Sequence, residues 1–231
     1  MKKLNTILSF MLLCNILHAQ KHQFYIEPTL SLGTSNVTQN YIQTPLNNTS
    51  YNRSNMVNYN GGILAGYEAK RWKIETGIEY MSTGYRLKGV YFGTLFNDIR
   101  NSSVSYKYNH LYMPLQLSYA FPVWDDITVE PIIGTAVGFN LGQKETNVYK
   151  DDKESSKMSK EVFNYRYNKM VLWGNTGFRF EYRIDRKFSI LAGSTFNYML
   201  TNFIKTSQVG YYTGQHNYTI LFNVGVRIRL S

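Results

Sequence analysis

The chain has little cysteine and proline: one Cys, Cys14, and 5 Pro among 231 residues. We expect Cys14 to be lost with a leader segment, and a chain without cysteine cannot build a disulfide framework, a cysteine metal site or a thiol nucleophile. Beyond residue 19 no long apolar run occurs, which excludes a bundle of membrane helices, since each helix needs about 20 apolar residues. A mean hydropathy of −0.33 still allows a membrane β-barrel, whose strands alternate apolar and polar residues.

The first 19 residues are typical of a secretory signal peptide. Lys2 and Lys3 form a basic start, residues 7–17 supply an apolar core, and Ala19 suits the position before a cleavage site. A permanent membrane anchor would need a longer core. We therefore predict a cleaved signal peptide over residues 1–19 and a single domain over residues 20–231.

Basic residues outnumber acidic ones, 25 against 15, for a formal net charge of +10. Nucleic-acid binding would account for this excess. The Lys and Arg residues are scattered, however, with no run of the kind that marks a nucleic-acid-binding arm. We therefore predict that loops and rims carry the charge and that nucleic acid is not a partner.

What the chain has in abundance is alternation of apolar and polar residues, in stretches long enough to be membrane-spanning strands, which need about 9 to 11 residues. Aromatic residues, with 20 Tyr and 13 Phe, make up 16% of the chain. Eight such stretches are separated by turn signals. They are Phe24–Thr34, Asn58–Ala69, Trp72–Leu87, Lys107–Phe121, Ile127–Leu141, Tyr167–Ile184, Lys187–Thr201 and Asn217–Leu230.

The connections between these stretches alternate in length. The long ones are Ser35–Val57, Lys88–Tyr106, Gly142–Arg166 and Asn202–His216, and the short ones are Lys70–Arg71, Pro122–Asp126 and Asp185–Arg186. Short turns on one rim and long loops on the other are typical of outer-membrane barrels. The sequence therefore predicts an all-β fold, an eight-stranded antiparallel up-and-down transmembrane β-barrel.

Each predicted strand has one apolar face and one polar face. The apolar face carries residues such as Ile74, Leu115 and Phe222. The polar face carries Glu27, Glu68, Lys73, Glu75, Glu79, Gln116, Glu130, Arg179, Glu181, Arg183, Asn223, Arg227 and Arg229, with glycines among them. Eight strands leave an interior too narrow for the large apolar set. We therefore expect the apolar face to contact lipid and the polar face to point inward.

Charges inside a barrel must be paired, because an unpaired buried charge costs several kcal/mol. We predict an interior salt-bridge network made of Glu27, Glu75, Glu79, Glu130, Glu181, Arg179, Arg183, Arg227 and Arg229. Paired acids acting on a sugar would need an open cleft, so we predict no catalytic residue. We also expect no metal and no cofactor.

Aromatic belts should mark the two membrane interfaces. The candidates near strand ends are Trp72, Trp124, Trp173, Tyr106, Tyr108, Tyr198 and Tyr218. Pro114 and Pro131 lie within strands, where proline removes a ladder hydrogen bond, and they predict local bulges.

Several patterns resemble the PorT-like small outer-membrane β-barrel proteins of Bacteroidota. They are HAQ at the end of the leader, GGILAGYEA, WKIETGIEYMSTGYRLKG, HLYMPLQLSYAF and FNVGVRIRL. The resemblance implies a barrel in the outer membrane and transfers no catalytic residue. It suggests envelope or secretion proteins as partners, besides outer-membrane lipid.

We therefore expect a non-enzymatic outer-membrane barrel with a charge-plugged interior and long extracellular loops for binding or assembly. The candidate loops are Ser35–Val57 and Gly142–Arg166. Three alternatives stay open: a small-solute pore, an outer-membrane lipid-modifying enzyme with His110 as its base, and a soluble ligand-binding barrel.

Overall fold

A computed structural model of the chain describes residues 22–41, 52–88, 103–149, 152–157, 167–205 and 212–230. The predicted signal peptide, residues 1–19, lies outside these residues. The strands are β1 (His22–Tyr41), β2 (Asn52–Ser54), β3 (Met56–Ala69), β4 (Trp72–Lys88), β5 (Ser103–Tyr119), β6 (Phe121–Pro122), β7 (Ile127–Tyr149), β8 (Asp152–Lys157), β9 (Met170–Arg183), β10 (Phe188–Met199) and β11 (Tyr212–Leu230). No helix among the described residues is long and apolar enough to cross a membrane.

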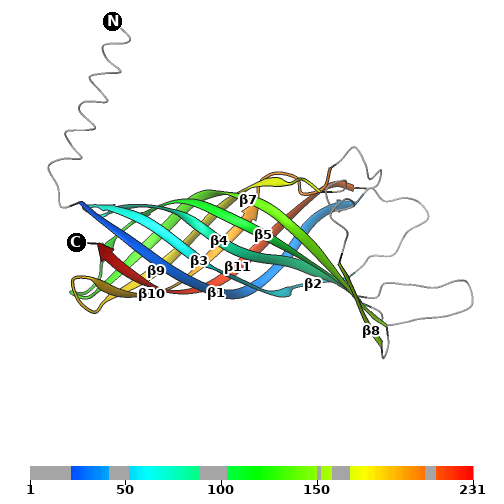
Figure 1. The fold of residues 1–231 in the computed structure, drawn as a ribbon, viewed down its shortest axis with the longest axis horizontal. Helices are drawn as coiled ribbons and strands as arrows, with labels where there is room; N and C mark the ends of the chain where they lie inside the picture. The colour runs from blue at the N-terminus through cyan, green and yellow to red at the C-terminus, as the bar shows by residue number, and fades with distance from the viewer. Residues whose placement is uncertain are drawn as a thin grey trace, which may run out of the picture.

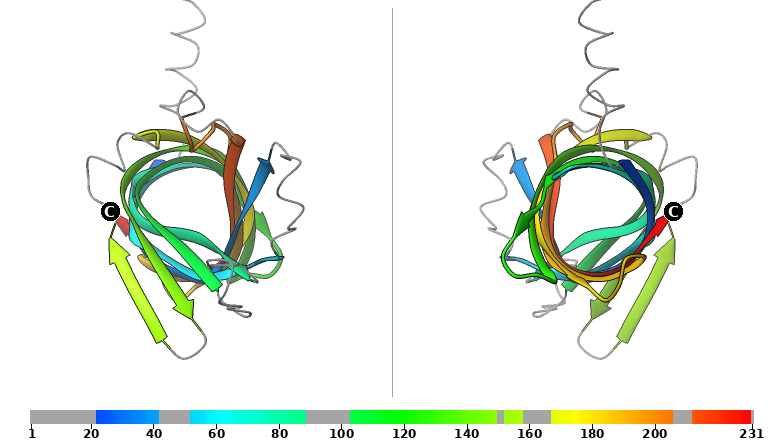
Figure 2. Two further views of the ribbon diagram at one scale, coloured as in Figure 1. Left: turned by 90° about the vertical axis from the view of Figure 1, so that its right-hand side faces the viewer. Right: turned by 90° about the vertical axis from the view of Figure 1, so that its left-hand side faces the viewer.

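Eight of these strands form a closed ring. The pairing order is β4-β3-β1-β11-β10-β9-β7-β5, and β5 pairs with β4 to complete the circle. Every pairing in the ring is antiparallel, and all of them except β1 with β11 join ring strands that follow one another along the chain. The end views show the resulting barrel (Figure 2). The predicted eight-stranded up-and-down barrel is confirmed.

The short turns lie at one end of the barrel, together with the start of β1 and the end of β11 (Figure 1). The turn between β3 and β4 has two residues, and Lys70 there has a positive φ of 58°. Only a left-handed residue reverses the chain in so short a hairpin. The ends of β1, β4 and β10 and the starts of β3, β5, β9 and β11 lie at the opposite end, here called the long-connection end.

The strands run further toward the long-connection end than the sequence predicts. Residues 35–41 continue β1, and residues 142–149 continue β7, which then pairs with β8 in a hairpin. The prediction of loops over all of Ser35–Val57 and Gly142–Arg166 is therefore wrong in these parts, because the charged and Asn-rich residues still complete backbone ladders. The loop prediction is also wrong for residues 52–54 and 56–57, which belong to β2 and β3. Residues 42–51, 150–151 and 158–166 lie outside the described residues.

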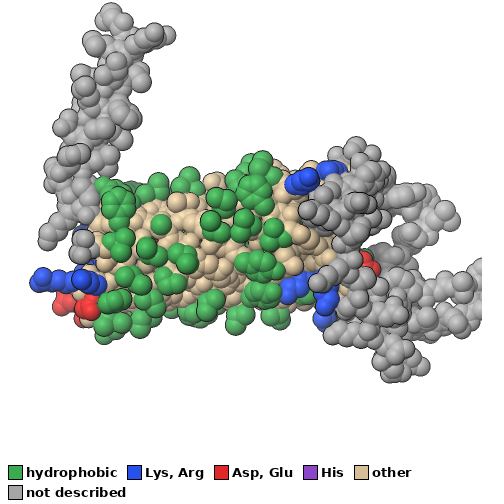
Figure 3. All heavy atoms as spheres, viewed as in Figure 1, with side chains coloured by type: hydrophobic (Ala, Val, Ile, Leu, Met, Phe, Trp, Pro, Cys, Tyr) green, Lys and Arg blue, Asp and Glu red, His purple; other side chains and the backbone are tan. Residues whose placement is uncertain are grey.

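The two faces of the wall are oriented as a membrane barrel requires. Outward side chains are apolar and exposed, such as Leu30 at 68% and Phe222 at 61%. Glu130 and Arg227, by contrast, point inward and are fully buried. The apolar side chains form a band around the barrel, and charged side chains appear at its two ends (Figure 3). Burial of the charged face rules out a soluble barrel.

The predicted bulges at Pro114 and Pro131 are wrong. The strand register continues unbroken past both residues. The irregularity between β5 and β7 falls instead at Asn109/His110. The ladder between β4 and β5 simply lacks the pairs at Met113 and Pro114, since a missing proline N–H removes a hydrogen bond without adding a residue.

Candidate functional site: the filled barrel interior

The inner face near the short turns holds a dense cluster of charges. Arg227 is completely buried and contacts the carboxylates of four strands. Its nitrogens lie 3.0 Å from Glu27, 3.1 Å from Glu75 and 2.9 Å from Glu130, and it also pairs with Glu181. The guanidinium carbon lies 4.5 Å above the centroid of the Tyr25 ring. The planar arginine guanidinium has five N–H donors and can therefore bind several carboxylates at once.

Arg179 is the second centre of the cluster. Its nitrogens lie 2.6 Å from Glu27, 2.7 Å from Glu75 and 2.8 Å from Glu130. Arg179 and Arg227 thus share three carboxylates, which ties β1, β4, β7, β9 and β11 together through side chains.

Arg229 and Lys73 complete the cluster on the side of the short turns. Arg229 pairs with Glu181 and donates a 2.7 Å hydrogen bond to Ser189. Lys73 pairs with Glu130 and lies 2.7 Å from Glu181. Both cations also approach Glu68, at 3.7 and 3.8 Å. Five carboxylates therefore surround four cations, so the charges in this desolvated space are close to balanced.

The structure brings together most, but not all, of the residues predicted for this network. Glu27, Glu75, Glu130, Glu181, Arg179, Arg227 and Arg229 all make ion pairs. Arg183 lies outside the ion-pair network. Strand alternation places it on the same face as Arg179 and Glu181, but it is the last residue of β9 and its side chain is exposed beyond the rim.

Glu79 is buried as predicted but lies outside the ion-pair network. Its carboxylate accepts hydrogen bonds from Thr29 (3.1 Å) and Asn60 (3.2 Å). Among the described residues it makes no ion pair, because it lies further along β4 than the arginines reach.

Lys73 and Tyr25 are members of the cluster that the sequence prediction left out. Lys73 shares the inward parity of Glu75 on β4, which was the available signal. The Tyr25 hydroxyl donates a 2.6 Å hydrogen bond to Glu75. Tyr25 lies two residues from Gln23 and from Glu27, with the apolar Phe24 and Ile26 between them, so strand alternation was the available signal for an inward Tyr25.

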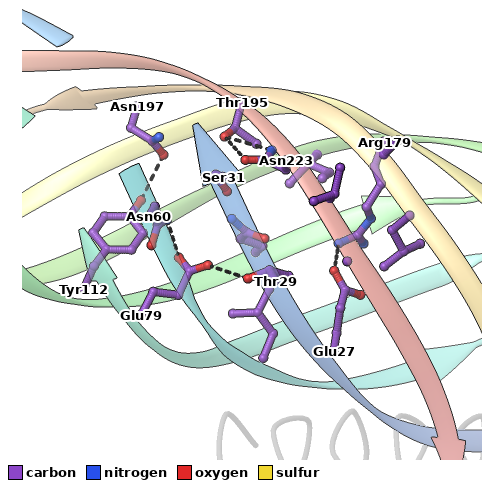
Figure 4. A pocket seen from close by; sticks show the side chains of 17 residues that line it. Glu27, Thr29, Ser31, Asn60, Glu79, Tyr112, Arg179, Thr195, Asn197 and Asn223 are labelled. Atoms are coloured by element: carbon purple, nitrogen blue, oxygen red, sulfur yellow. Dashed lines mark hydrogen bonds and ion pairs between the residues drawn. The ribbon is translucent and has the colours of Figure 1, made fainter. Parts of the chain in front are cut away.

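A small polar cavity lies in the middle of the barrel, between the charge cluster and the long-connection end (Figure 4). Its lining includes Glu79, Asn60, Tyr112, Asn197 and Asn223. The cavity volume of about 40 Å³ is enough for roughly three water molecules at 10–15 Å³ each. Asn60 Oδ1 is buried without a protein partner, as expected where water completes the hydrogen bonding.

The long-connection end of the interior is filled by aromatic side chains. Trp173, Tyr108 and Phe203 are almost completely buried there, and the ring centroids of Tyr108 and Phe203 are 4.7 Å apart. Phe203 belongs to the segment after β10 that folds into the barrel mouth, where its N–H bonds to the Gln215 carbonyl at 2.9 Å. The predicted belt position of Trp173 and Tyr108 is therefore wrong, because both point inward. Trp72 is exposed on the outer wall, and Trp124 is exposed in the turn between β6 and β7.

His110, the candidate enzymatic base, is part of this aromatic filling. It is fully buried, bonds to Thr83 Oγ1 at 2.9 Å and pairs with Asn140 Oδ1. Its ring packs edge-on against Trp173, with centroids 5.7 Å apart. Both ring nitrogens thus have protein partners, and the ring faces the lumen instead of lipid.

A metal centre finds no support in the part of the chain that the structure describes. No group of three or more His, Cys, Asp or Glu side chains there is arranged to hold a metal ion.

The interior and the wall together define the class of molecule. A closed ring of long tilted strands, an apolar outer band, a polar interior and unequal connections at the two rims are the features of barrels in the bacterial outer membrane. The chain is an outer-membrane β-barrel protein.

Known proteins share this architecture but little sequence. No protein-family model matches the chain, and no curated protein does. A major outer-membrane protein of Thermus thermophilus is 11% identical with a TM-score of 0.48, over 90% of this chain and 99% of that one. Neisserial surface protein A is 12% identical with a TM-score of 0.43, over 90% and 97%. Outer membrane protein W of E. coli is 12% identical with a TM-score of 0.41, over 92% and 100%. The assignment above rests on strand order and face orientation.

Proposed function

We propose that this barrel is a closed, non-enzymatic outer-membrane scaffold that presents its long-connection end to envelope or secretion proteins outside the cell. The observation that carries the proposal is the hairpin of β7 and β8, which projects past the barrel rim (Figure 1). The filled interior supports a scaffold in preference to a pore, because the charge cluster and the aromatic filling occupy the two ends of the lumen. PorT-like membership stays a prediction.

The hairpin offers a specific means of recognition. Within the described residues β8 pairs with β7 alone, so the backbone N–H and C=O groups of its other edge are open to a further strand. Exposed edges of this kind are used by proteins that add a strand from a partner. We propose strand addition to β8 as the mode of binding.

Site-specific photo-crosslinking in intact cells tests this proposal. A photoreactive residue at Ser155 in β8 should give a discrete crosslinked protein, and the same residue at Asp125, on the short-turn rim, serves as the matched control. Deleting residues 150–157 should abolish copurification of that protein while leaving heat-modifiable gel mobility, and hence the barrel, intact. The proposal fails if an epitope inserted in the hairpin cannot be labelled in intact cells, or if the deletion leaves copurification unchanged.

A further inference from the structure

The outer wall carries a patch of positive charge at the end of the barrel with the long connections. Arg86, Lys88, Lys107 and Lys144, here called the outer-wall basic patch, come from the adjacent strands β4, β5 and β7. Arg86, Lys88 and Lys144 are exposed and Lys107 is half-buried. Their neighbours Tyr85, Tyr108 and Gln143 are buried, so strand alternation directs the four cations outward, away from the lumen. Lys and Arg side chains are visible beyond the apolar band at this end (Figure 3).

The register brings these cations close together. Lys107 lies directly opposite Lys144 in the β5–β7 ladder. Arg86 pairs with Ser105, two residues from Lys107. Like charges placed directly opposite each other destabilise a sheet. An anion held between them removes that repulsion.

Among the side chains that the structure describes, no carboxylate offsets this repulsion. Within the described part of the chain, none of the four cations makes an ion pair with an acid. Glu145 is the nearest acid along β7, but it lies next to Lys144 and therefore points toward the opposite face of the strand. Hydroxyl groups lie among the cations instead: Arg86 Nε donates a 3.0 Å hydrogen bond to Ser105 Oγ, and Thr146 lies opposite Ser105 in the ladder.

The patch lies at the level of the membrane interface. Lys107 Nζ is 4.4 Å from the centroid of the outward-facing Tyr59 ring. Tyr59 in turn stacks on Tyr80, with centroids 6.0 Å apart. Outward tyrosines of this kind mark the headgroup level of a bilayer, and the apolar band continues below them with residues such as Ile78 and Ile63.

From this geometry we infer that the outer-wall basic patch is a binding site for the phosphate groups of an anionic glycolipid in the outer leaflet. The acyl chains lie against the apolar band, Tyr59 and Tyr80 contact the interface, and the Arg and Lys side chains together with the Ser105 hydroxyl bind the phosphate. Arginine and lysine on adjacent strands provide the charge-assisted donors that phosphate requires. The inference rests on the outer-membrane orientation and is independent of a protein partner at β8.

Native mass spectrometry of the detergent-purified full chain tests the inference, with lipid A and dephosphorylated lipid A as probes. The wild type should bind phosphorylated lipid A at least tenfold more tightly, a difference of about 1.4 kcal/mol. The variant Arg86→Gln/Lys88→Gln/Lys107→Gln/Lys144→Gln should lose that preference. Raising the salt concentration should weaken binding, because exposed charges are screened.

The matched control removes four exposed cations from the other rim, in the variant Arg71→Gln/Arg183→Gln/Arg186→Gln/Lys187→Gln. Its affinity for phosphorylated lipid A should stay within about threefold of the wild type, because salt screens the interaction of exposed charges beyond about 10 Å. Heat-modifiable mobility shows that each variant is folded. Equal binding of the two lipids by the wild type, or an equal loss of affinity in both variants, overturns the inference. Neither result bears on crosslinking at β8.

Discussion

At the scale of single residues, the buried charge of Arg227 is the most consequential feature. Its guanidinium contacts Glu27, Glu75, Glu130 and Glu181 while wholly shielded from water. Removing one partner of a buried ion pair is strongly destabilising because the remaining charge stays desolvated. The stability lost when Arg227 is removed therefore depends on the buried carboxylates that remain without a partner.

We expect Arg227→Ala to lower the free energy of unfolding by about 3–5 kcal/mol. Urea titration of the protein refolded in lipid vesicles, followed by tryptophan fluorescence, measures the change. Arg183→Ala is the matched control, since its side chain is exposed at the end of β9 and such changes usually stay within about 0.5 kcal/mol. Equal unfolding midpoints for the two variants would show that the charge cluster does not stabilise the barrel.

For single residues, the sequence predicts whether a side chain points inward but not which residue it pairs with. Strand parity correctly predicts that Glu75, Glu130 and Arg227 point inward, because one face of each strand is apolar. Parity cannot show how far along the barrel axis a side chain reaches, and this is why Arg183 and Glu79 were wrongly placed in the network. Which residue pairs with which depends on the stagger between strands, and that stagger appears only once the ring is closed.

At the scale of elements, the turn between β9 and β10 has a local electrostatic anchor. The Asp185 carboxylate accepts hydrogen bonds from the backbone N–H groups of Phe188 (2.7 Å) and Lys187 (2.6 Å). These bonds, that of Phe188 first, lower the pKa of Asp185 below its ordinary value. Protonation would weaken both bonds, because they favour the charged form.

We expect Asp185→Ala to destabilise the turn at neutral pH and to have no effect in acid. The folded pKa is lowered, so the contribution is present above the unfolded pKa and disappears as pH falls through the folded pKa. Carboxyl NMR titration should place the midpoint below about 3.9, the value for an unperturbed aspartate. A midpoint at or above that value would contradict the hydrogen-bonded geometry.

The glycines illustrate a different limit of prediction at this scale. Some inward glycines leave room for large side chains: a Cβ at Gly66 would meet the Tyr25 ring, and one at Gly138 would meet the Trp173 indole. A Cβ at Gly33 would meet the backbone carbonyl of Ile220 on the neighbouring strand. Gly33 therefore permits close approach of β1 and β11, a property of the closed sheet that strand alternation does not encode.

At the scale of the whole molecule, the question is whether the barrel conducts. The charge cluster fills the end with the short turns, and the aromatic filling around Trp173 and Phe203 occupies the other. Open aqueous channels are a property of barrels with about 16 strands or more. The cavity that the described residues line between the two fillings has room for only a few water molecules.

We therefore expect no conductance steps in planar bilayers, with a 16-stranded porin as the positive control. Trp173→Ala/Phe203→Ala should also stay silent, because the charge cluster still closes the opposite end. Steady single-channel steps from the wild type would overturn the closed-scaffold proposal and favour the small-solute pore.

The pairing of Glu27 with Arg227 has a further consequence for how the protein is made. These residues are 200 positions apart, on the first and last strands, which form the seam of the cylinder. Until that seam closes, the wall is an open sheet whose inner carboxylates and guanidiniums would face hydrocarbon. During biogenesis the inner charges must therefore stay in contact with water until the barrel closes. Closure requires β11, so β1 and β11 can pair only after β11 has been translated and delivered to the membrane.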